Sequence, residues 1–464
     1  VIGACRGGLS GDIRPITISN ANEYVDRPTE CALVLNTPFA LIRTIGKSVF
    51  VVPDYFKTQE EAEKVFTPIH QFTHPFGTEK KNVVVLIVES FGREYIGALN
   101  KDLEGGNYKG YTPYVDKLIE QSTTYKYSYC NGRKSIDGMP SVLCGIPMFI
   151  EPFVLTPQSV NNFTGLAGIL SNEGYSTAFF HGAIRGSMGF LAFAKKTGFK
   201  EYYGREDYAA DPRFGGDADF DGHWGIWDEP FFQYMNEILS KKKEPFFSTI
   251  FTVSSHHPFH IPKKYEGKFD KGTLEIHQCI GYTDYAIKQF FACAKKQPWF
   301  ENTIFVFVND HPNQTYYEHY KQAITNMGAA IMFYSPNPDL VPTKRYSEIS
   351  QQIDIYPSLV DLMGYQKPFR SWGRSVFASS ADETPRAFIS NALMYQMKQG
   401  NYIYILDENG QVNGIYNKED EALKHNLWSK EDNAEIQKGI KDLQAFVQDY
   451  MDRIINHKLA PSKN

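Results

Sequence analysis

Three places in this sequence set metal-capable side chains directly behind an apolar run. They are the pairs Glu89-Ser90, His256-His257 and Asp310-His311. A single acidic residue in such a place is more often a helix cap than a ligand. Two carboxylates and an imidazole brought together are a donor set that suits Zn²⁺ or Mn²⁺. The three pairs therefore predict a divalent metal site, provided that one sheet carries all of them.

A fourth segment, NGRKSIDGMPSVLCGIP at 131–147, supplies a hydroxyl group. Its glycines and polar start predict a tight turn that leads into a short helix, with Ser135 at the helix N-terminus. Backbone N–H groups and the helix dipole favour an anion there. A nearby divalent cation lowers the pKa of a hydroxyl enough to make it a nucleophile. Alone, Ser135 would be an ordinary cap; beside the metal-ligand candidates it is the candidate nucleophile.

The elements that would position these residues alternate between strands and helices. Buried strands are predicted where β-branched and aromatic residues run together, at 82–90, 176–182, 246–255, 303–311 and 329–336. Helices are predicted between them, at 113–125, 163–173, 229–241 and 282–296. This alternation predicts an α/β fold with a mostly parallel central sheet flanked by helices. Ligands of such sheets gather beyond the carboxyl ends of the strands, so the three pairs would meet at one edge.

The 464 residues divide into three predicted parts. Residues 1–80 are rich in polar and turn residues and are predicted to wrap around the core, following a lost membrane anchor. Residues 81–383 would form the catalytic domain. Residues 384–464 are predicted to form short antiparallel strands, with a hairpin turn at Asn409-Gly410, and an amphipathic helix at Asn433–Ile455 that packs on the core.

Composition narrows the functional classes. The net charge of −5 and the pI near 6.2 leave none of the basic footprint that is typical of nucleic-acid binding. The longest purely apolar run, Val83–Val88, is far shorter than the roughly 20 residues that a membrane-spanning helix needs. Because the chain opens on Val1 rather than Met, we expect that an upstream segment, such as a signal or an anchor, was removed.

Two further features have more than one interpretation. Cys130 and Cys144 flank Ser135 and could pair if the chain lies outside the cytoplasm; otherwise they stay free thiols. The acidic segment 217–223 has the look of a calcium loop, but EF-hand spacing would require Glu where Asp228 stands. We therefore predict a solvated loop at 217–223.

Five segments, in this order, resemble a known superfamily. Four of them are similar to the signature regions of sulfatases and alkaline phosphatases: Asn82–Gly92, Asn131–Gly145, Phe251–Phe259 and Thr303–His311. The fifth, Gln352–Phe377, is similar to the usual end of that catalytic domain. The resemblance lies in the ordered set rather than in any single motif, and it implies the α/β fold expected above.

Within this superfamily, sulfatases fit the chain less well. Their nucleophile motif requires Pro and Arg two and four residues after the nucleophile, where this chain has Asp137 and Met139. Conversion of Ser135 to the formylglycine that sulfate ester hydrolysis needs is therefore not expected. Sulfatases also carry paired Asp after the first strand, whereas this chain has the single Glu89.

The chain is more similar to the lipoteichoic acid synthase-like phosphoglycerol transferases. The similar motifs are Glu89-Ser90, the turn Arg133-Lys134-Ser135, the run His256–Phe259 and the pair Asp310-His311. This resemblance implies that one divalent metal is held by Glu89, Ser135, Asp310 and His311. It also implies substrate contacts from His256, His181, Arg185 and Lys134.

Two departures from that family pattern bear on the substrate. The usual nucleophile is Thr, and Ser135 offers the same hydroxyl group. The synthases also have a Trp and an Arg after the strand that ends in His181-Gly182, where this chain has Met188 and Phe190. Arg185 is the candidate substitute for that Arg. The identity of the phosphoglycerol donor therefore stays open.

The resemblance implies a transferase that moves a phosphoglycerol-type group from a lipid donor to the hydroxyl of a glycan or lipid acceptor. The reaction would pass through a covalent phosphoryl-serine on Ser135 and need one divalent metal ion, with Mn²⁺ expected and Mg²⁺ or Zn²⁺ as alternatives. A phosphodiesterase or sulfatase-type hydrolase is the alternative, and a catalytically silent binding protein is a third. The catalytic domain would face the periplasm or exterior at a bacterial cell membrane, tethered by an N-terminal anchor absent from this chain.

Overall fold

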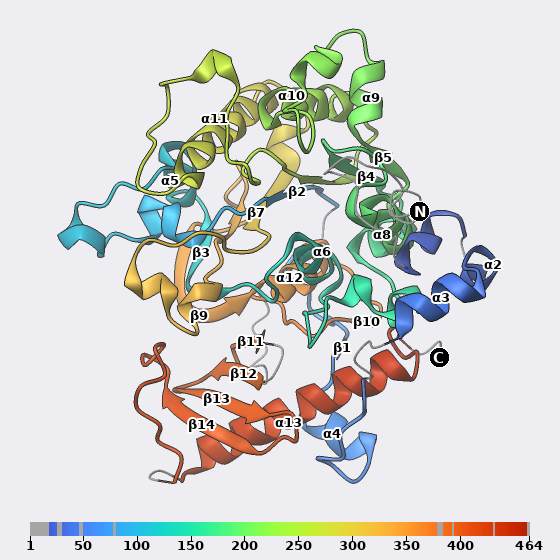
Figure 1. Cartoon of the computed structure of the whole chain (residues 1–464), viewed down its shortest axis with the longest axis vertical. Coiled ribbons are helices and arrows are strands. Elements are labelled where there is room, and N and C mark those ends of the chain that lie inside the picture. The colour runs from blue at the N-terminus through green and yellow to red at the C-terminus, as the bar shows by residue number, and fades with distance from the viewer. Residues whose placement is uncertain are drawn as a thin grey trace.

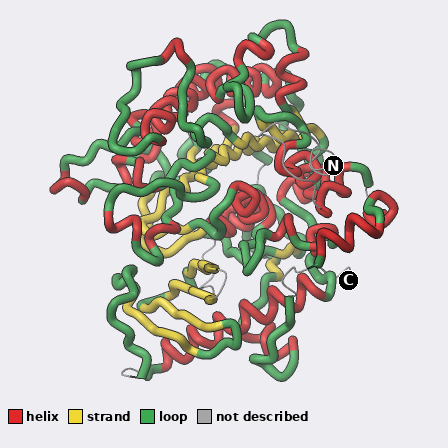
Figure 2. The backbone as a smooth tube through the Cα atoms, in the orientation of Figure 1, coloured by secondary structure: helices red, strands yellow, loops and turns green. Residues whose placement is uncertain are grey.

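The computed structural model describes residues 18–25, 30–45, 50–77, 80–377, 384–391, 394–429 and 432–461. Its centre is one eight-stranded sheet (Figures 1 and 2). In spatial order the strands are β5 (Glu201–Tyr203), β4 (Ser176–His181), β6 (Phe246–Phe251), β2 (Asn82–Val88), β7 (Thr303–Asn309), β8 (Ile331–Tyr334), β3 (Thr123–Tyr129) and β9 (Lys344–Gln351). Within this sheet β8 alone runs opposite to the others. The prediction of a mostly parallel sheet is confirmed.

Strand β2 lies in the middle of the sheet, and this position accounts for the unbroken apolar run Val83–Val88. All seven of its residues are buried. Val83, Val85 and Ile87 belong to the core on one face, whereas Val84, Leu86 and Val88 belong to the core on the other. A strand covered on both faces has no solvated side, so the six positions after Asn82 are apolar. The buried amide of Asn82 is hydrogen-bonded to Glu244 and to the N–H of Phe246. Its parallel neighbours β6 and β7 end at the same edge, which places the three predicted pairs together.

Helices cover both faces of the sheet, as predicted (Figure 1). One face is covered by α5 (Pro113–Ile119), α9 (Arg205–Ala210), α10 (Asp228–Leu239) and α11 (Ile276–Ala294). The other face is covered by α6 (Ser135–Cys144), α7 (Leu166–Asn172), α8 (Phe190–Thr197) and α12 (Ile355–Leu362).

The helix predicted at 113–125 is wrong at its end. Helix α5 stops at Ile119, and residues 123–129 form strand β3. The run TTYKYSY is β-branched and aromatic, a composition that favours a strand. Strands β5 and β9 were not predicted at all, because β5 has only three residues and the first half of β9 is polar and largely exposed.

The C-terminal part has the predicted small antiparallel sheet and helix. The strands are β11 (Arg386–Asn391), β12 (Met394–Gln399), β13 (Tyr402–Asp407) and β14 (Val412–Asn417), in that order. Asn409-Gly410 lies in the turn between β13 and β14, where Gly410 has the positive φ of 73° that favours glycine. Helix α13 (Ala434–Ile455) packs its apolar face against this sheet and the core.

The N-terminal residues contain α2 (Cys31–Val34), α3 (Thr37–Thr44), α4 (Gln59–Val65) and β1 (Ile69–His70). Strand β1 pairs with β10 (Phe369–Arg370), and Glu63 of α4 forms an ion pair with Arg453 of α13. The segment 50–77 thus runs across elements from far along the chain. The domain boundaries at 80/81 and 383/384 stay predictions. Among the described residues, no helix combines the length and apolar character needed to cross a membrane.

Candidate active site

The candidate nucleophile lies at the start of α6, on a turn that its own sequence builds. Lys134 is the N-cap residue and Ser135 is the first residue of the helix. The carboxylate of Asp137 accepts the backbone N–H groups of Arg133 and Lys134, at 3.0 and 3.1 Å. Gly132 is required beside it, because a Cβ there would lie 2.1 Å from the Asp137 Cβ. The prediction of a turn leading into a short helix is therefore confirmed.

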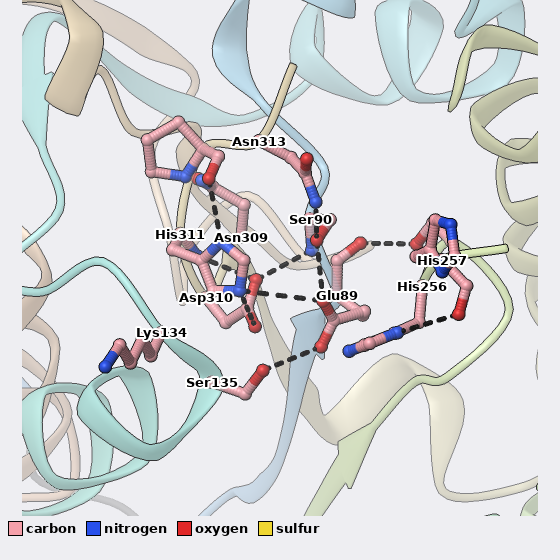
Figure 3. A network of polar contacts seen from close by, with 12 residues as sticks. Glu89, Ser90, Lys134, Ser135, His256, His257, Asn309, Asp310, His311 and Asn313 are labelled. Atoms are coloured by element: carbon pink, nitrogen blue, oxygen red, sulfur yellow. Dashed lines mark hydrogen bonds and ion pairs between the residues drawn. The ribbon is translucent and has the colours of Figure 1, made fainter. Parts of the chain in front are cut away.

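Ser135 faces Glu89, which follows directly on β2 (Figure 3). The Ser135 hydroxyl donates a hydrogen bond to Glu89 Oε2 at 2.9 Å, and the Ser90 hydroxyl donates to Oε1 at 2.6 Å. Glu89 is 2% exposed and Ser135 is 7% exposed. Ser90 has a φ of 54°, a strained backbone conformation for a residue with a side chain. At this turn the backbone changes direction after β2, whereas the Glu89 side chain remains in the site.

Asp310 and His311 follow directly on β7 and complete the cluster. Asp310 Oδ1 accepts the N–H groups of Ser90 at 2.8 Å and His311 at 2.7 Å. Asp310 Oδ2 is buried and accepts no hydrogen bond from any described residue. His311 Nε2 lies 3.2 Å from that oxygen and 3.6 Å from Glu89 Oε1.

The atoms of this cluster fit a bound cation. His311 Nδ1 lies 2.7 Å from the carbonyl oxygen of Pro312, which can only accept, so Nδ1 carries a hydrogen. In the neutral ring the lone pair is then on Nε2, facing the unpaired oxygen of Asp310. Glu89, Asp310 and His311 each offer a ligand atom within 4.8 Å of the others. Electron pairs converging this closely need a proton or a cation between them, and the donor set suits a divalent ion.

The pKa shifts have the same cause. Burial and the charge of Glu89 raise the pKa of Asp310 well above its usual range. Burial opposes charge on His311, but the carboxylates of Asp310 and Glu89 outweigh it and raise the His311 pKa. Burial also opposes charge on Glu89, yet the imidazoles of His311 and His256 keep its pKa low. Without a metal, bound protons therefore offset the excess negative charge of this site.

The two predicted substrate-binding histidines lie at the same edge. His256 is half-buried, and its Nδ1 donates to the carbonyl oxygen of His257 at 3.1 Å. His181 is buried at the end of β4, and its Nδ1 donates to the Phe251 carbonyl at 3.0 Å. Burial lowers the pKa of His181 to about 4. Its Nε2 is buried and makes no hydrogen bond within the described part of the chain.

The other two predicted substrate contacts are less well placed. The Arg185 guanidinium binds both carboxylate oxygens of Asp207, with its side chain 43% exposed. Lys134 is exposed, and Figure 3 shows its side chain pointing away from Glu89. Phe190 stands at the position where the resemblance to the synthases led us to expect Arg. It is buried and packs against His181, with 4.7 Å between the two ring centroids. The roles of Arg185 and Lys134 stay predictions.

The structure adds residues that the sequence alone did not single out. Gln352 is buried, and its Nε2 donates to the carbonyl oxygens of Asn309 and Asp310, at 2.6 and 2.8 Å. Its Oε1 accepts the N–H of Asn131 at 2.9 Å, which connects the metal-ligand turn to the nucleophile turn. Asn313 Nδ2 donates to Ser90 Oγ at 2.8 Å. Amide side chains in loops carry no periodic signal, so only their place within a family motif could have marked them.

Neither a sulfatase nucleophile motif nor a disulfide is present around Ser135. Asp137 caps the turn, and Met139 is 1% exposed in the apolar core, so no guanidinium occupies that position. Cys130 and Cys144 are buried free thiols. Of the two alternatives for Cys130 and Cys144, a disulfide or two free thiols, the structure has the free thiols.

The fold and site together define a chain of the alkaline phosphatase superfamily, with a hydroxyl nucleophile beside a candidate metal cluster. Residues 81–365 match the family model described as sulfatase, and the chain belongs to that family. The resemblance on which the sequence prediction rested is thereby confirmed.

Its curated relatives include a lipoteichoic acid synthase and a phosphoglycerol transferase. Lipoteichoic acid synthase 1 of Bacillus subtilis is 25% identical over 341 residues, which cover 67% of this chain and 50% of that protein. Phosphoglycerol transferase I of Citrobacter koseri is 29% identical over 315 residues, which cover 63% of this chain and 38% of that protein. The chain thus spans half or less of the length of these relatives.

Solved structures support the fold. A protein of the alkaline phosphatase superfamily from Vibrio parahaemolyticus is similar with a TM-score of 0.69 and 24% identity, covering 84% of this chain and 90% of that one. The lipoteichoic acid synthase LtaP from Listeria monocytogenes is similar with a TM-score of 0.68 and 19% identity, covering 88% of this chain and 100% of that one. These likenesses extend beyond the matched family region to most of the chain.

Proposed function

We propose that this chain is the catalytic part of a metal-dependent phosphoglycerol transferase that forms a phosphoryl-serine intermediate on Ser135. One observation carries the proposal: the Ser135 hydroxyl donates to Glu89, and Glu89 shares a buried cluster with Asp310 and His311. The curated relatives named as lipoteichoic acid synthase and phosphoglycerol transferase support the choice of a phosphoglycerol group.

In the first half-reaction Ser135 Oγ attacks the phosphorus of a lipid donor such as phosphatidylglycerol. A divalent ion held by Glu89, Ser135, Asp310 and His311 would supply Lewis acidity, which lowers the hydroxyl pKa and offsets charge on the phosphate. The Ser135 proton moves towards Glu89 Oε2, which already accepts its hydrogen bond. A bond forms between phosphorus and Oγ, the bond from phosphorus to the diacylglycerol oxygen breaks, and that oxygen takes up the proton that Ser135 released.

The substrate needs partners beside the metal cluster, and the two histidines offer them. His256 and His181 both have Nδ1 engaged by a backbone carbonyl, which leaves Nε2 as the ring nitrogen for substrate. Burial keeps His181 neutral, so its Nε2 is an acceptor that suits a substrate hydroxyl, and this buried atom accepts no hydrogen bond from the described residues. In its doubly protonated form the His256 ring also donates from Nε2, and a fixed donor of this kind stabilises charge that develops on the non-bridging oxygens.

In the second half-reaction the hydroxyl oxygen of a glycan or lipid acceptor bonds to phosphorus and the bond from phosphorus to Ser135 Oγ breaks. The proton of the acceptor hydroxyl returns to Oγ, which restores Ser135. Water in place of the acceptor would make the enzyme a phosphodiesterase, which is the alternative function. A formylglycine-dependent sulfatase is the less supported alternative, because Asp137 and Met139 replace the Pro and Arg of that motif.

The remaining parts of the proposal concern the ion and the setting. Mn²⁺ is the proposed ion, since two carboxylates, one imidazole and one hydroxyl form a mainly oxygen donor set; Mg²⁺ and Zn²⁺ are alternatives. A lipid donor requires access to a membrane surface, so we place the domain on the outer side of a bacterial cell membrane. An N-terminal anchor outside this chain would tether it there.

A single assay separates the candidates. Fluorescent phosphatidylglycerol in mixed micelles with Mn²⁺ should yield diacylglycerol, and mass spectrometry of the trapped enzyme should find a phosphoglycerol adduct on Ser135. A rate that rises with added glycan or glycolipid acceptor supports the transferase, whereas an acceptor-independent rate supports the phosphodiesterase. Absence of both the adduct and turnover would reject the proposal.

A further inference from the structure

The acidic segment 217–223 leads into a turn at the edge of the candidate site. This turn is held by hydrogen bonds and is more than a solvated loop. One carboxylate oxygen, Asp221 Oδ1, accepts three successive backbone N–H groups: those of His223 at 2.8 Å, Trp224 at 2.7 Å and Gly225 at 3.1 Å. Three donors on one oxygen fix the backbone of the turn tightly. Asp221 is therefore a structural centre rather than a free surface charge.

This Asp221-centred turn is tied to both strand ends that carry the predicted substrate histidines. Ile226 N–H donates to the carbonyl of Gly182, directly after His181, at 2.9 Å. His260 Nε2 donates to the carbonyl of Asp221, also at 2.9 Å, from the loop that follows β6. A Cβ at Gly225 would lie 2.5 Å from the Gly182 oxygen, so the approach of the two backbones requires glycine. The turn thus bridges the His181 and His256 segments.

Trp224 projects from this turn onto His256. The two rings are 3.9 Å apart between centroids, with planes tilted by 46°. Trp224 Nε1 donates to the carbonyl oxygen of His257 at 2.7 Å, and His256 Nδ1 donates to the same oxygen at 3.1 Å. One acceptor therefore fixes the indole and the imidazole together. Figure 3 shows the other nitrogen of the His256 ring directed towards Glu89 and Ser135.

We propose that Trp224 is the positioning residue for His256, which rests on the proposed role of His256 as a hydrogen-bond donor to the substrate phosphate. The contact between the two rings and the shared carbonyl hold the imidazole in one orientation, with Nε2 presented to the site. A half-buried ring without such support would sample several rotamers, and the ordering cost would fall on substrate binding. The Asp221-centred turn supplies this support from outside the ends of β4 and β6, whereas Met188 and Phe190 offer no polar group.

A calcium site is the competing explanation for the same acidic residues, and their contacts disfavour it. Asp217 forms an ion pair with Arg205 at 2.8 Å, and Asp219 accepts the hydroxyl of Tyr208 at 2.5 Å. Asp221 Oδ1 is already shared by three N–H groups, as described above. The side chains are thus engaged by separate partners instead of converging on one point, which leaves the turn-building role.

The first test reads His256 directly and needs no turnover. In protein labelled with ¹⁵N-histidine, the His256 ring signals are assigned by their loss in His256→Gln. Trp224→Phe keeps an aromatic ring but loses the Nε1 donor, and it should shift the His256 ring signals while the overall spectrum persists. Trp428→Phe, at a partly exposed indole in the C-terminal part, is the matched control and should leave them unchanged. His256 signals that do not respond to Trp224→Phe would overturn the proposal.

The second test is a double-mutant cycle on turnover of phosphatidylglycerol with Mn²⁺. Trp224→Ala should lower kcat/KM by roughly tenfold, the equivalent of about 1.4 kcal/mol. In the His256→Gln background the same change should have almost no effect, because Trp224 acts through His256. Additive losses would mean that Trp224 contacts substrate itself or acts through general stability, and would reject the proposal. If the wild-type chain shows no turnover, the proposed function fails, and the ring signals still decide the positioning role.

Discussion

Ser135 Oγ lies 2.9 Å from Glu89 Oε2, although the two residues are 46 positions apart in the chain. Glu89 follows the central strand β2, and Ser135 opens helix α6. The contact depends on how closely α6 packs on the end of β7: a Cβ at Gly138 would lie 3.0 Å from the Asp310 Cβ. One glycine thus allows the nucleophile helix to reach the metal-ligand turn.

Ser135→Ala should abolish turnover without unfolding the protein. The change removes the attacking oxygen and one hydrogen bond to Glu89, so we expect a loss of at least about 10³-fold in kcat. Turnover is measured as diacylglycerol release and folding as the thermal unfolding midpoint.

Two comparisons make that result specific. Ser135→Thr keeps a hydroxyl and should retain part of the activity. Ser141→Ala removes another buried serine of the same helix, one that donates to the Asp137 carbonyl at 2.8 Å, and should leave most of the activity. A Ser135→Ala protein with wild-type turnover would show that another group is the nucleophile.

Metal binding should stabilise the fold through Asp310. Because Asp310 Oδ2 is buried and accepts no hydrogen bond from the described residues, a cation there takes the place of the proton that the raised pKa of Asp310 otherwise retains. At a hundredfold excess of Mn²⁺ over its Kd, the free energy of unfolding should rise by about 2.7 kcal/mol. Scanning calorimetry with EDTA and then with Mn²⁺ measures this rise.

The Asp310→Asn variant should lose the Mn²⁺-induced rise in stability while remaining folded. Asp116→Asn is the control, since Asp116 is a half-buried carboxylate of helix α5, outside the candidate metal cluster, that accepts the N–H of Ala98 at 3.0 Å. That variant should keep the full response to Mn²⁺. A response that survives Asp310→Asn would place the ion somewhere else.

Gln352→Ala should weaken both stability and metal binding. The Gln352 side-chain amide donates to the carbonyl oxygens of Asn309 and Asp310 and accepts the N–H of Asn131, all in the interior. Truncation leaves these backbone groups unpaired, for an expected loss of about 2 to 4 kcal/mol in the free energy of unfolding. Urea unfolding measures that loss, and Mn²⁺ titration calorimetry measures the affinity.

Gln399→Ala separates the two effects. Gln399 is also buried and donates to Asp442 at 2.6 Å, but it lies in the C-terminal sheet. We expect it to lower stability and to leave Mn²⁺ affinity unchanged. Equal losses of affinity in both variants would mean that Gln352 affects the metal only through general stability.

The sequence was sufficient to predict which candidate residues lie close together, because that information is local. Glu89, Asp310 and His311 each follow an apolar strand, and the α/β alternation brings the ends of such strands to one edge. Glu89, Asp310 and His311 were found in this way, and Ser135 was found from the glycine-rich turn. The structure brings these four residues together.

Information that depends on tertiary contacts could not be obtained in the same way. Strand β9 has a polar first half, and only its pairing with β3 makes it a strand. Arg185 suited the substrate site by charge, but in the folded chain Asp207 binds its guanidinium. The Trp224–His256 contact joins two loops whose spacing has no period. Such contacts are determined by packing between distant segments.

Cys130 and Cys144 should be unreactive in the native protein and reactive after unfolding. Burial raises the pKa of the Cys144 thiol to about 12, and burial together with the charge of Asp310 raises that of Cys130 as well. Iodoacetamide at pH 8 should spare both until urea is added, because the thiolate is the reactive form. Peptide mass spectrometry reads the sites. Protection that persists in urea until a reductant is added would reveal a disulfide instead.

Stability should fall as the pH rises from about 4 to 7 because of Asp284. This buried carboxylate of α11 accepts the N–H groups of Tyr114 and Val115 at the start of α5, at 3.0 and 2.8 Å. Burial nevertheless raises its pKa to about 7, against about 3.9 in an unfolded chain. Between these values the folded protein holds a proton that the unfolded chain has released. Raising the pH therefore lowers the free energy of unfolding, by at most about 1.4 kcal/mol per pH unit.

Comparison with Asp284→Asn isolates this contribution from the other titrating groups. Urea unfolding of both proteins is measured from pH 4 to 8, and the difference, wild type minus variant, is plotted against pH. The Asn side chain does not titrate, so the difference should decrease with pH and level off above about 7. A constant offset would mean that Asp284 acts only as a cap of α5, and a difference that increases with pH would mean that the two N–H groups outweigh burial and stabilise the carboxylate.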